Sequence, residues 1–211
     1  MPPYRTITSN EEPQNSCCGT AHAYLLPSLS QIFANLAPPE KRIFDLGCGN
    51  GSIANWLSEK GFQVSGCDPS ESGIAEAKKA YPELDLYVGS AYDDLASKFG
   101  NFPLLISLEV VEHVYAPRDY AKTVYNLLQP GGYALISTPY HSYLKNLALA
   151  ATGKMDEHFT ALWDHGHIKF WSVKTITKLL TEANLSVEKI YRIGRIAPLA
   201  KTMIILARRG E

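Results

Sequence analysis

Three glycines at alternate positions follow a short apolar run and could let a ligand approach the backbone closely. The run Ile43-Phe44-Asp45-Leu46 is typical of a buried strand, and Gly47, Gly49 and Gly51 follow it directly. Glycine tolerates positive φ and has no Cβ to obstruct a ligand. The Asp45 carboxylate at the strand end could accept hydrogen bonds from a cationic amine, directly or through the loop. The alternative is a tight strand-to-helix turn that binds nothing.

An acidic residue ends the second expected strand, about 20 residues after the glycines, where it can accept both ribose hydroxyls of an adenosine. This residue is Asp68, within Gly66-Cys67-Asp68-Pro69-Ser70. NAD would use the same acid, but a dinucleotide site favours GxGxxG, whose third glycine lets the helix approach a pyrophosphate. Here Ser52 and Ile53 follow Gly51, and the loop has no Lys or Arg to meet a phosphate. The spacing therefore favours S-adenosylmethionine (SAM), which carries no phosphate, over NAD.

Two carboxylates and a histidine follow the fourth expected strand, within Glu109-Val110-Val111-Glu112-His113. Histidine is the usual general base near neutral pH, so His113 is the leading candidate to take a proton. Glu109 and Glu112 lie three residues apart and could share a helical face. Together with His113 they could hold Mg²⁺ or Zn²⁺. We expect no metal here; Glu109 and His113 would then line the cofactor pocket, and Glu112 would bond to backbone.

A long aromatic and histidine-rich segment, residues 140–171, interrupts the regular alternation of strands and helices. Loops of this length are usually functional or disordered, and aromatic walls with a few polar groups suit a flat, partly apolar substrate. His165 and His167 alternate and could both face the pocket as catalytic candidates. Leu144–Ala151 is expected to pack inward rather than to touch a membrane surface. The candidate substrate contacts are Tyr140, His158, Trp163, His165, Phe170 and Trp171, with packing within the insert as the alternative for Trp163, Phe170 and Trp171.

The elements that must position these residues form a repeating pattern. Strand and helix alternate five times, which predicts a parallel sheet with helices on both faces. The late strands Val187–Ile193 and Met203–Ala207 could pair as a hairpin and add an antiparallel strand. A helix is expected from Ala21 to Leu36. The fold class is therefore α/β: a Rossmann-like, doubly wound, mostly parallel seven-stranded sheet. We expect one domain over 1–211, with an N-terminal arm and helix (1–38) and a small capping insert (140–171) before the last helix and strands.

Composition excludes several classes of protein. The chain has 211 residues and a net charge of −1 without a long basic run, so a nucleic-acid partner is not indicated. The four cysteines, Cys17, Cys18, Cys48 and Cys67, have neither disulfide-framework nor zinc spacing, which suits a reducing cytosol. No signal-peptide pattern appears, and no apolar stretch approaches the roughly 20 residues that span a bilayer. We expect a cytoplasmic protein with no stable membrane insertion; its oligomeric state stays open.

Three motifs, in order, resemble those of the class I SAM-dependent methyltransferases: DLGCGNG at 45–51, Cys67-Asp68, and Leu128-Gln129-Pro130-Gly131-Gly132. The ExxEH at Glu109–His113 resembles a signature of the ubiquinone-biosynthesis O-methyltransferases and the small-molecule methyltransferases around them. The chain departs from the family at Ser90, where many relatives carry an Asp for the adenine amine. The cofactor contacts that the resemblance implies are Asp45, Gly47, Cys48, Gly49, Gly51, Asp68, Pro69, Ser90, Ala91, Tyr92, Leu108 and Glu109.

The resemblance also implies an activity. It is transfer of the SAM methyl group to an oxygen, or as a second choice a nitrogen, of a small molecule, with S-adenosylhomocysteine as the product. In similar families the segment after the fifth strand forms a lid over the substrate. A non-catalytic SAM-binding module and an NAD-dependent oxidoreductase are the alternatives.

Overall fold

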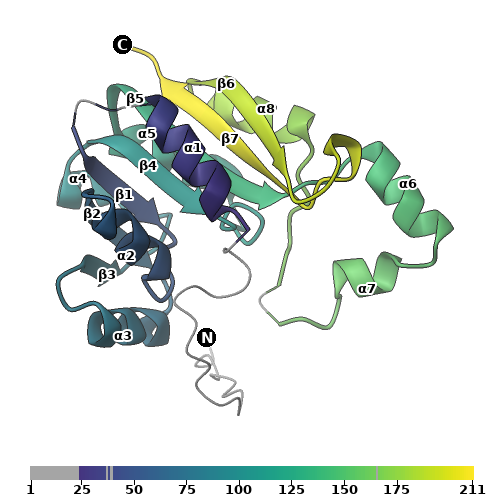
Figure 1. Ribbon diagram of the computed structural model, residues 1–211, viewed down its shortest axis with the longest axis horizontal. Coiled ribbons are helices and arrows are strands. Elements are labelled where there is room, and N and C mark those ends of the chain that lie inside the picture. The colour runs from purple at the N-terminus through teal and green to yellow at the C-terminus, as the bar shows by residue number, and fades with distance from the viewer. Residues whose placement is uncertain (1–23, 37, 39, 165) are drawn as a thin grey trace.

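The computed structural model describes residues 24–36, 38, 40–164 and 166–211 (Figure 1). Within these residues, seven strands form one sheet in the order β3-β2-β1-β4-β5-β7-β6. The neighbours of β1 are β2 and β4, both parallel to it, so the strand order reverses beside β1. β7 runs antiparallel between β5 and β6, which confirms the predicted hairpin and the mostly parallel sheet. The strands are β1 (Arg42–Leu46), β2 (Gln63–Asp68), β3 (Asp85–Val88), β4 (Phe102–Leu108), β5 (Leu128–Pro139), β6 (Leu185–Ile193) and β7 (Thr202–Arg209).

Helices cover both faces of the sheet, because neighbouring side chains of a strand point to opposite faces. Ile43 joins the apolar cluster that contains α1, α2 and α3, whereas the adjacent Phe44 joins the cluster of α4, α5 and α8. The core is therefore two apolar layers separated by the sheet. The helices are α1 (Leu26–Leu36), α2 (Ser52–Glu59), α3 (Glu71–Ala80), α4 (Leu95–Phe99), α5 (Pro117–Leu127), α6 (Tyr143–Ala151), α7 (Met155–Phe159) and α8 (Val173–Glu182), with a 3₁₀ turn η1 (Ala197–Leu199) before β7.

Local sequence signals set where several helices begin. Ser70 caps α3 by accepting a hydrogen bond from the Gly73 amide, and Ser172 forms a capping box with Thr175 at the start of α8. Pro117 occupies the first turn of α5, where its missing N–H costs nothing.

The first helix begins later than expected. α1 begins at Leu26, so the predicted start at Ala21 is wrong for the described part of that range, and residues 21–23 lie outside the described residues. Pro27 gives the reason, since proline is accepted in a first turn but disrupts a helix interior.

The insert between β5 and α8 carries α6 and α7, which stand away from the sheet in Figure 1. The expectation that Leu144–Ala151 packs inward is wrong. Tyr143 and Leu147 are 97% and 65% exposed, and the buried residue of α6 is Lys145. The Lys145 ammonium donates to the Tyr140 carbonyl at 2.8 Å, so a lysine side chain rather than an apolar one occupies the inner side of this helix. None of the described helices has both the length and the apolar character needed to cross a membrane.

Candidate cofactor and active site

The glycine loop lies between the carboxyl end of β1 and α2, next to the reversal in strand order where doubly wound sheets bind ligands. Gly47, Gly49 and Gly51 have φ values of 90°, 52° and 77°, so all three use the left-handed conformations that glycine allows. The loop is tied to the end of β2, because the Gly47 amide donates to the Cys67 carbonyl at 2.8 Å. A Cβ on Gly49 would meet no atom within 4 Å. The backbone is therefore open to a ligand at that point.

Gly47→Ala is expected to lower the free energy of unfolding by more than Gly49→Ala does. A Cβ at Gly47 would lie 2.3 Å from the Val110 Cγ2 atom, whereas a Cβ at Gly49 would enter open space. Both variants also carry left-handed backbone strain, which costs on the order of 1–3 kcal/mol. Denaturant unfolding without ligand measures the difference, and Gly49→Ala serves as the matched control. Equal unfolding midpoints for the two variants would show that Val110 does not pack on the loop.

Asp68 at the end of β2 is held in a single orientation. Its Oδ2 atom accepts from the Gly49 amide at 2.9 Å, and Oδ1 accepts from the Ser70 amide at 2.8 Å. Each carboxylate oxygen has a second lone pair, so both can still accept a hydroxyl. The acid is thus bonded to the open glycine loop, as a ribose-binding residue requires.

Asp45 is a buried acid that forms no ion pair within the described part of the chain. It is 2% exposed, and its Oδ2 atom has no hydrogen-bond partner among the described residues. Burial, and secondarily the charge of Asp68, raise the pKa of Asp45 to about 8. An orphaned carboxyl group beside an open loop is suited to a cationic amine such as that of SAM. The residues present therefore fit this cofactor.

The affinity for SAM is expected to increase as pH rises toward the Asp45 pKa of about 8. The cationic amine favours the ionised carboxylate, so binding below that pKa releases a proton, and Kd falls by up to about tenfold per pH unit. The same shift makes the unliganded protein less stable as pH rises from the usual value of 3.8 to about 8, because the folded state retains the proton. Calorimetry in buffers of different ionisation enthalpy measures the released proton. Asp45→Asn should remove it; wild-type binding without proton release would contradict the assignment.

The loop after β3 carries the predicted adenine contacts Ser90, Ala91 and Tyr92. The Ser90 amide donates to Asp93 Oδ2 at 2.7 Å, and the Ser90 hydroxyl accepts from the Tyr92 amide at 3.2 Å. The Tyr92 hydroxyl in turn accepts from the Ala116 amide at 3.1 Å. The loop is thus closed on itself by the Asp93 carboxylate, a residue that the sequence reading missed. The roles of these residues toward adenine stay predictions.

The remaining predicted cofactor residues lie around the same strand ends. Pro69 follows Asp68 and is exposed, whereas Leu108 is buried in the apolar layer of α1, α2 and α3. Cys48 and Cys67 are buried free thiols, and Cys17 and Cys18 lie outside the described residues.

The segment after β4 is a turn rather than a helix, so the expectation of a shared helical face is wrong. Glu109 has a φ of 55°, and the His113 amide donates to the Val110 carbonyl at 2.9 Å. The Glu109 carboxylate accepts from the Ser137 hydroxyl at 2.7 Å, and its amide donates to the same oxygen at 3.0 Å. Ser137, near the end of β5, therefore fixes the orientation of the Glu109 carboxylate.

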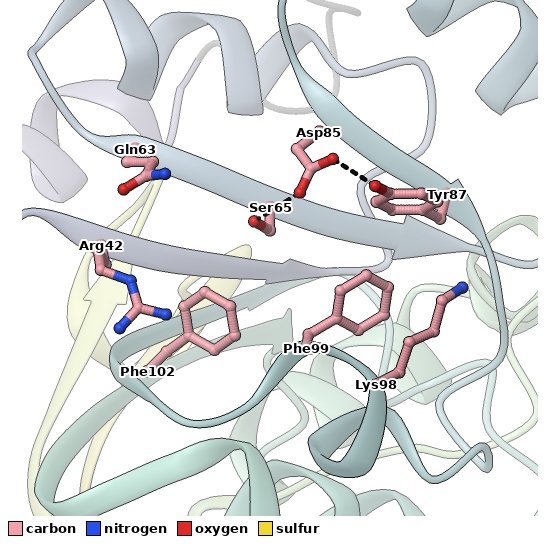
Figure 2. Close-up of a pocket in the computed structure, with 8 residues that line it drawn as sticks. All are labelled: Arg42, Gln63, Ser65, Asp85, Tyr87, Lys98, Phe99 and Phe102. Carbon is pink, nitrogen blue, oxygen red and sulfur yellow. Dashed lines mark hydrogen bonds between the residues drawn. The ribbon is translucent and has the colours of Figure 1, made fainter.

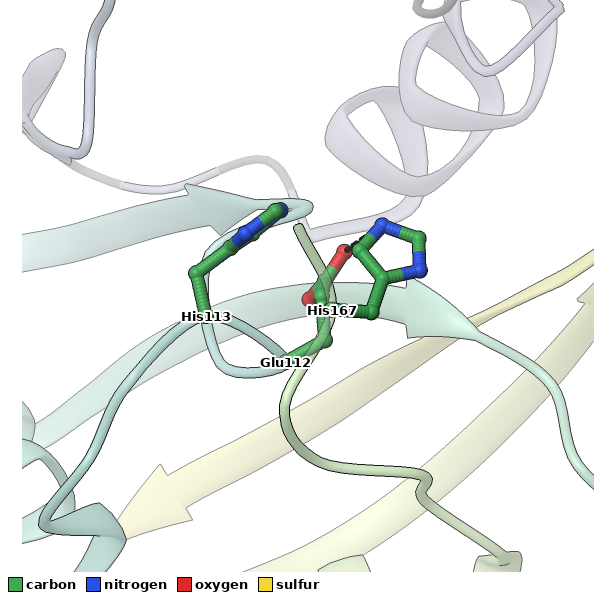
Figure 3. Close-up of side chains that lie close together, drawn as sticks. All are labelled: Glu112, His113 and His167. Carbon is green, nitrogen blue, oxygen red and sulfur yellow. Dashed lines mark ion pairs between the residues drawn. The ribbon is translucent and has the colours of Figure 1, made fainter. Parts of the chain in front are cut away.

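Glu112, His113 and His167 lie together above the strand ends (Figure 3). His167 Nε2 lies 3.9 Å from Glu112 Oε1, and the rings of His113 and His167 are 4.9 Å apart. One potential ligand atom from each residue lies within 4.8 Å of the others, so these three could hold a metal ion. The alternative metal set of Glu109, Glu112 and His113 is thus replaced by one that contains His167. His165 lies outside the described residues.

Burial and neighbouring charges shift the pKa values of Glu112 and His167 in this cluster and of the adjacent Glu109. Glu112 is 1% exposed, and burial together with the charge of Glu109 raises the pKa of Glu112 well above its usual range. Burial also raises the pKa of Glu109, whereas burial and the charge of His113 lower the pKa of His167. His113 Nδ1 lies 3.2 Å from the Gly166 carbonyl. A proton on Nδ1 for this hydrogen bond leaves Nε2 as the basic atom.

The returning part of the insert, residues 166–171, is bonded along the turn after β4. The amides of Ile168 and Lys169 both donate to the Glu112 carbonyl at 2.9 Å, and the Trp171 indole donates to the Val111 carbonyl at 3.0 Å. These bonds place His167 beside His113, although the two residues are far apart in sequence. We refer to residues 166–171 as the strap.

The predicted substrate residues divide into two groups. Tyr140 and Trp171 are buried in the core, which fits a packing role, the alternative expected for Trp171. Trp163 and Phe170 are exposed. Trp163 lies edge-on to the His113 ring at 6.0 Å, and Phe170 lies edge-on to His141 at 5.1 Å. Contact between any of them, or His158, and a substrate stays a prediction.

A hollow of about 350 Å³ lies at the other end of the sheet (Figure 2). Its acid, Asp85, accepts from the Tyr87 hydroxyl at 2.6 Å and from the Ser65 hydroxyl at 3.2 Å, and Arg42 lies over the Phe102 ring. Because its lining includes the first residues of β1 to β4, it opens at the amino ends of the strands, away from the glycine loop. It is not the candidate active site. Its lining is Arg42, Gln63, Ser65, Asp85, Tyr87, Lys98, Phe99 and Phe102.

Sequence reasoning also missed a contact between the turn just before α1 and the last strand. The hydroxyls of Tyr24 and Thr202 share a hydrogen bond of 2.6 Å. Burial and then the charge of Glu109 raise the pKa of Tyr24 to about 12, which places this pair beside the carboxyl groups. No local motif marks either residue.

Comparison with known proteins agrees with this geometry. Residues 20–190 match a methyltransferase domain family. A ubiquinone biosynthesis O-methyltransferase of Caulobacter sp. (strain K31) is 37% identical over 116 residues, covering 53% of this chain and 46% of the relative. A SAM-dependent methyltransferase of Methanosarcina mazei shares the fold with a TM-score of 0.65 at 20% identity, over 85% of this chain and 97% of that one.

Magnesium protoporphyrin IX methyltransferase of Synechocystis, solved with bound S-adenosylhomocysteine, has a TM-score of 0.64 at 19% identity, over 90% of this chain and 85% of that one. The chain spans about half the length of the first curated relatives that it matches, 46% and 45%. The family match, in contrast, extends over most of the chain. The chain therefore belongs to the methyltransferase domain family and has the fold of the SAM-dependent methyltransferases.

Proposed function

We propose that the protein transfers the methyl group of SAM to a hydroxyl oxygen of a small molecule, with His113 as the general base. The observation that carries this proposal is the contact between the turn after β4 and the glycine loop. Val110 packs against Gly47, so His113, three residues later, lies next to the predicted cofactor site. The names of the curated relatives support an oxygen acceptor.

The glycine loop, Asp45 and Asp68 would hold the cofactor. SAM supplies a methyl group that its sulfonium already activates for displacement. The chain therefore has three tasks: to align the acceptor, to exclude water and to accept a proton. The exposed Trp163 ring beside His113 is placed to cover a bound acceptor.

His113 would accept the hydroxyl proton at Nε2 while the Gly166 carbonyl holds Nδ1. The imidazolium that forms lies next to His167, whose Nε2 faces the Glu112 carboxyl group. Glu112, whose pKa is raised by burial and by Glu109, could lose its proton as the imidazolium forms, and its carboxylate would then offset this positive charge. Glu112 and His167 are thus positioning residues for the base.

A turnover screen tests the proposal, with labelled SAM as donor and catechols, quinone precursors, sugars and amines as acceptors. The expected result is methylation of hydroxyl-bearing acceptors at oxygen, established by mass spectrometry and NMR of the product. Each reaction is run with and without EDTA, and we expect equal turnover because the base needs no metal. Methylation confined to amines would overturn the oxygen assignment. Loss of turnover in EDTA, with recovery on adding Mg²⁺ or Zn²⁺, would assign Glu112, His113 and His167 to a metal.

A further inference from the structure

The capping insert and the β6–β7 connection bring together basic side chains that the proposed mechanism does not use. We call His141, Lys145, His158 and Arg195 the basic cluster. Lys145 is 8% exposed and His141 is 6% exposed, whereas Arg195 lies on the surface of the connection. The connection contacts the start of α6, since the Ser142 hydroxyl donates to the Pro198 carbonyl at 3.0 Å. Side chains from both segments can therefore act on one ligand.

The buried members of the cluster have unused polar atoms. The Lys145 ammonium has three donors, and its hydrogen bond to the Tyr140 carbonyl uses one of them. His141 Nδ1 is buried without a hydrogen-bond partner among the described residues. Its ring is surrounded by His158 at 5.4 Å, Phe159 at 5.8 Å and Phe170 at 5.1 Å. Aromatic rings and hydrogen-bonding groups thus lie side by side in this part of the insert.

No carboxylate pairs with the basic cluster within the part of the chain that the structure describes. Instead, positive charges within the cluster lower the pKa values of neighbouring members. Burial and then the charge of Arg195 lower the pKa of Lys145, and burial followed by the charges of Lys145 and Arg195 lowers the pKa of His158. Burying a cation is costly unless an anion accompanies it. Lys145 therefore offers a positive charge to an anion that no carboxylate of the described residues supplies.

The basic cluster adjoins the strap that carries His167, because the His141 amide donates to the Trp171 carbonyl at 3.0 Å. His158 contributes to lowering the pKa of His167, and the His167 ring lies 4.9 Å from that of His113. The rings of Phe159 and Phe170, 4.8 Å apart, belong to the same insert and contact His141. An acceptor whose hydroxyl reaches His113 could thus extend an anionic group toward Lys145.

We infer that the methyl acceptor carries an anionic group, a carboxylate or a phosphate, which Lys145, His158 and Arg195 bind while His113 receives the hydroxyl proton. This inference rests on the proposed function and specifies its substrate class. His141 donates or accepts one hydrogen bond at the same place, since burial and the charge of Lys145 lower its pKa to about 4 and keep it neutral.

The first test compares three acceptors that share a catechol ring: catechol, 3,4-dihydroxybenzoate and 3,4-dihydroxyphenylphosphonate. At least one anionic acceptor should have a kcat/KM about tenfold or more above that of catechol, mainly through KM, as one added charged hydrogen bond predicts. The anionic acceptor with the higher kcat/KM shows whether the site prefers a carboxylate or a phosphate-like group. Lys145→Met should reduce the ratio of anionic to neutral kcat/KM about tenfold, and Lys154→Met, an exposed lysine between α6 and α7, should not change it. A ratio near one in the wild type would overturn the inference.

Arg195→Met provides a second variant at an exposed position, should Lys145→Met not fold. The second test needs no turnover: benzoate and inorganic phosphate are titrated into the protein saturated with S-adenosylhomocysteine, and the imidazole NMR signals are followed. Saturable shifts of the His141 and His158 signals, weakened in Arg195→Met, support the anion site. Unshifted signals, together with equal use of neutral and anionic catechols, would reject the inference and leave O-methylation standing. Anion binding without methylation of any hydroxyl would reject the proposed function instead.

Discussion

His113→Ala is expected to lower kcat by about 10²–10⁴-fold, the usual contribution of general acid–base catalysis, while the affinity for SAM is unchanged. The physical reason is that the variant has no group at this place to accept the hydroxyl proton. The cofactor loop should be unaffected, because its bonds run to Cys67 and Asp68 rather than to His113. Turnover with the best acceptor from the screen measures kcat, and calorimetry measures SAM binding.

His113→Gln distinguishes a base from a packing residue. Glutamine can still donate a hydrogen bond to the Gly166 carbonyl, which His113 Nδ1 contacts at 3.2 Å, but it cannot take up a proton near neutral pH. We therefore expect His113→Gln to be as slow as His113→Ala. Wild-type turnover by His113→Gln would show that the residue only holds the strap, and the base would have to be sought elsewhere in the site.

Asp68→Ala is expected to weaken binding of SAM and S-adenosylhomocysteine by about 100-fold or more. Hydrogen bonds to a charged group contribute about 1.5–3 kcal/mol each, and the variant loses two to the ribose. It also frees the Gly49 and Ser70 amides, whose bonds to Asp68 are 2.9 and 2.8 Å long. Calorimetry with S-adenosylhomocysteine measures the loss without interference from turnover.

Asp85→Ala is the matched control for Asp68→Ala. Asp85 also accepts two hydrogen bonds, from Ser65 and Tyr87, but it lies in the hollow at the amino ends of the strands (Figure 2). Its removal should leave cofactor affinity unchanged. If both variants bound S-adenosylhomocysteine as tightly as the wild type, the ribose would not lie at Asp68. Denaturant unfolding of both variants separates loss of binding from loss of the fold.

The cofactor side of the molecule could be predicted because its signals are local in sequence. The alternation of strands and helices, the glycine spacing and the acid after the second strand all depend on neighbours within a few residues. Backbone geometry converts such patterns directly into structure, since glycines permit positive φ and the residue that ends a parallel strand lies at the ligand edge. The sequence accordingly predicts one site for Asp45, Gly49 and Asp68, and the structure places Gly49 and Asp68 in direct hydrogen-bond contact.

The acceptor side was decided by tertiary structure alone. His167 joins Glu112 and His113 because the strap is bonded to the turn after β4, while Ser137 holds the Glu109 carboxylate. α6 turns its charged Lys145 inward and leaves its apolar residues exposed, the opposite of what its composition predicts. Both outcomes depend on which distant segments pack together, and no periodicity or motif along the chain encodes that choice.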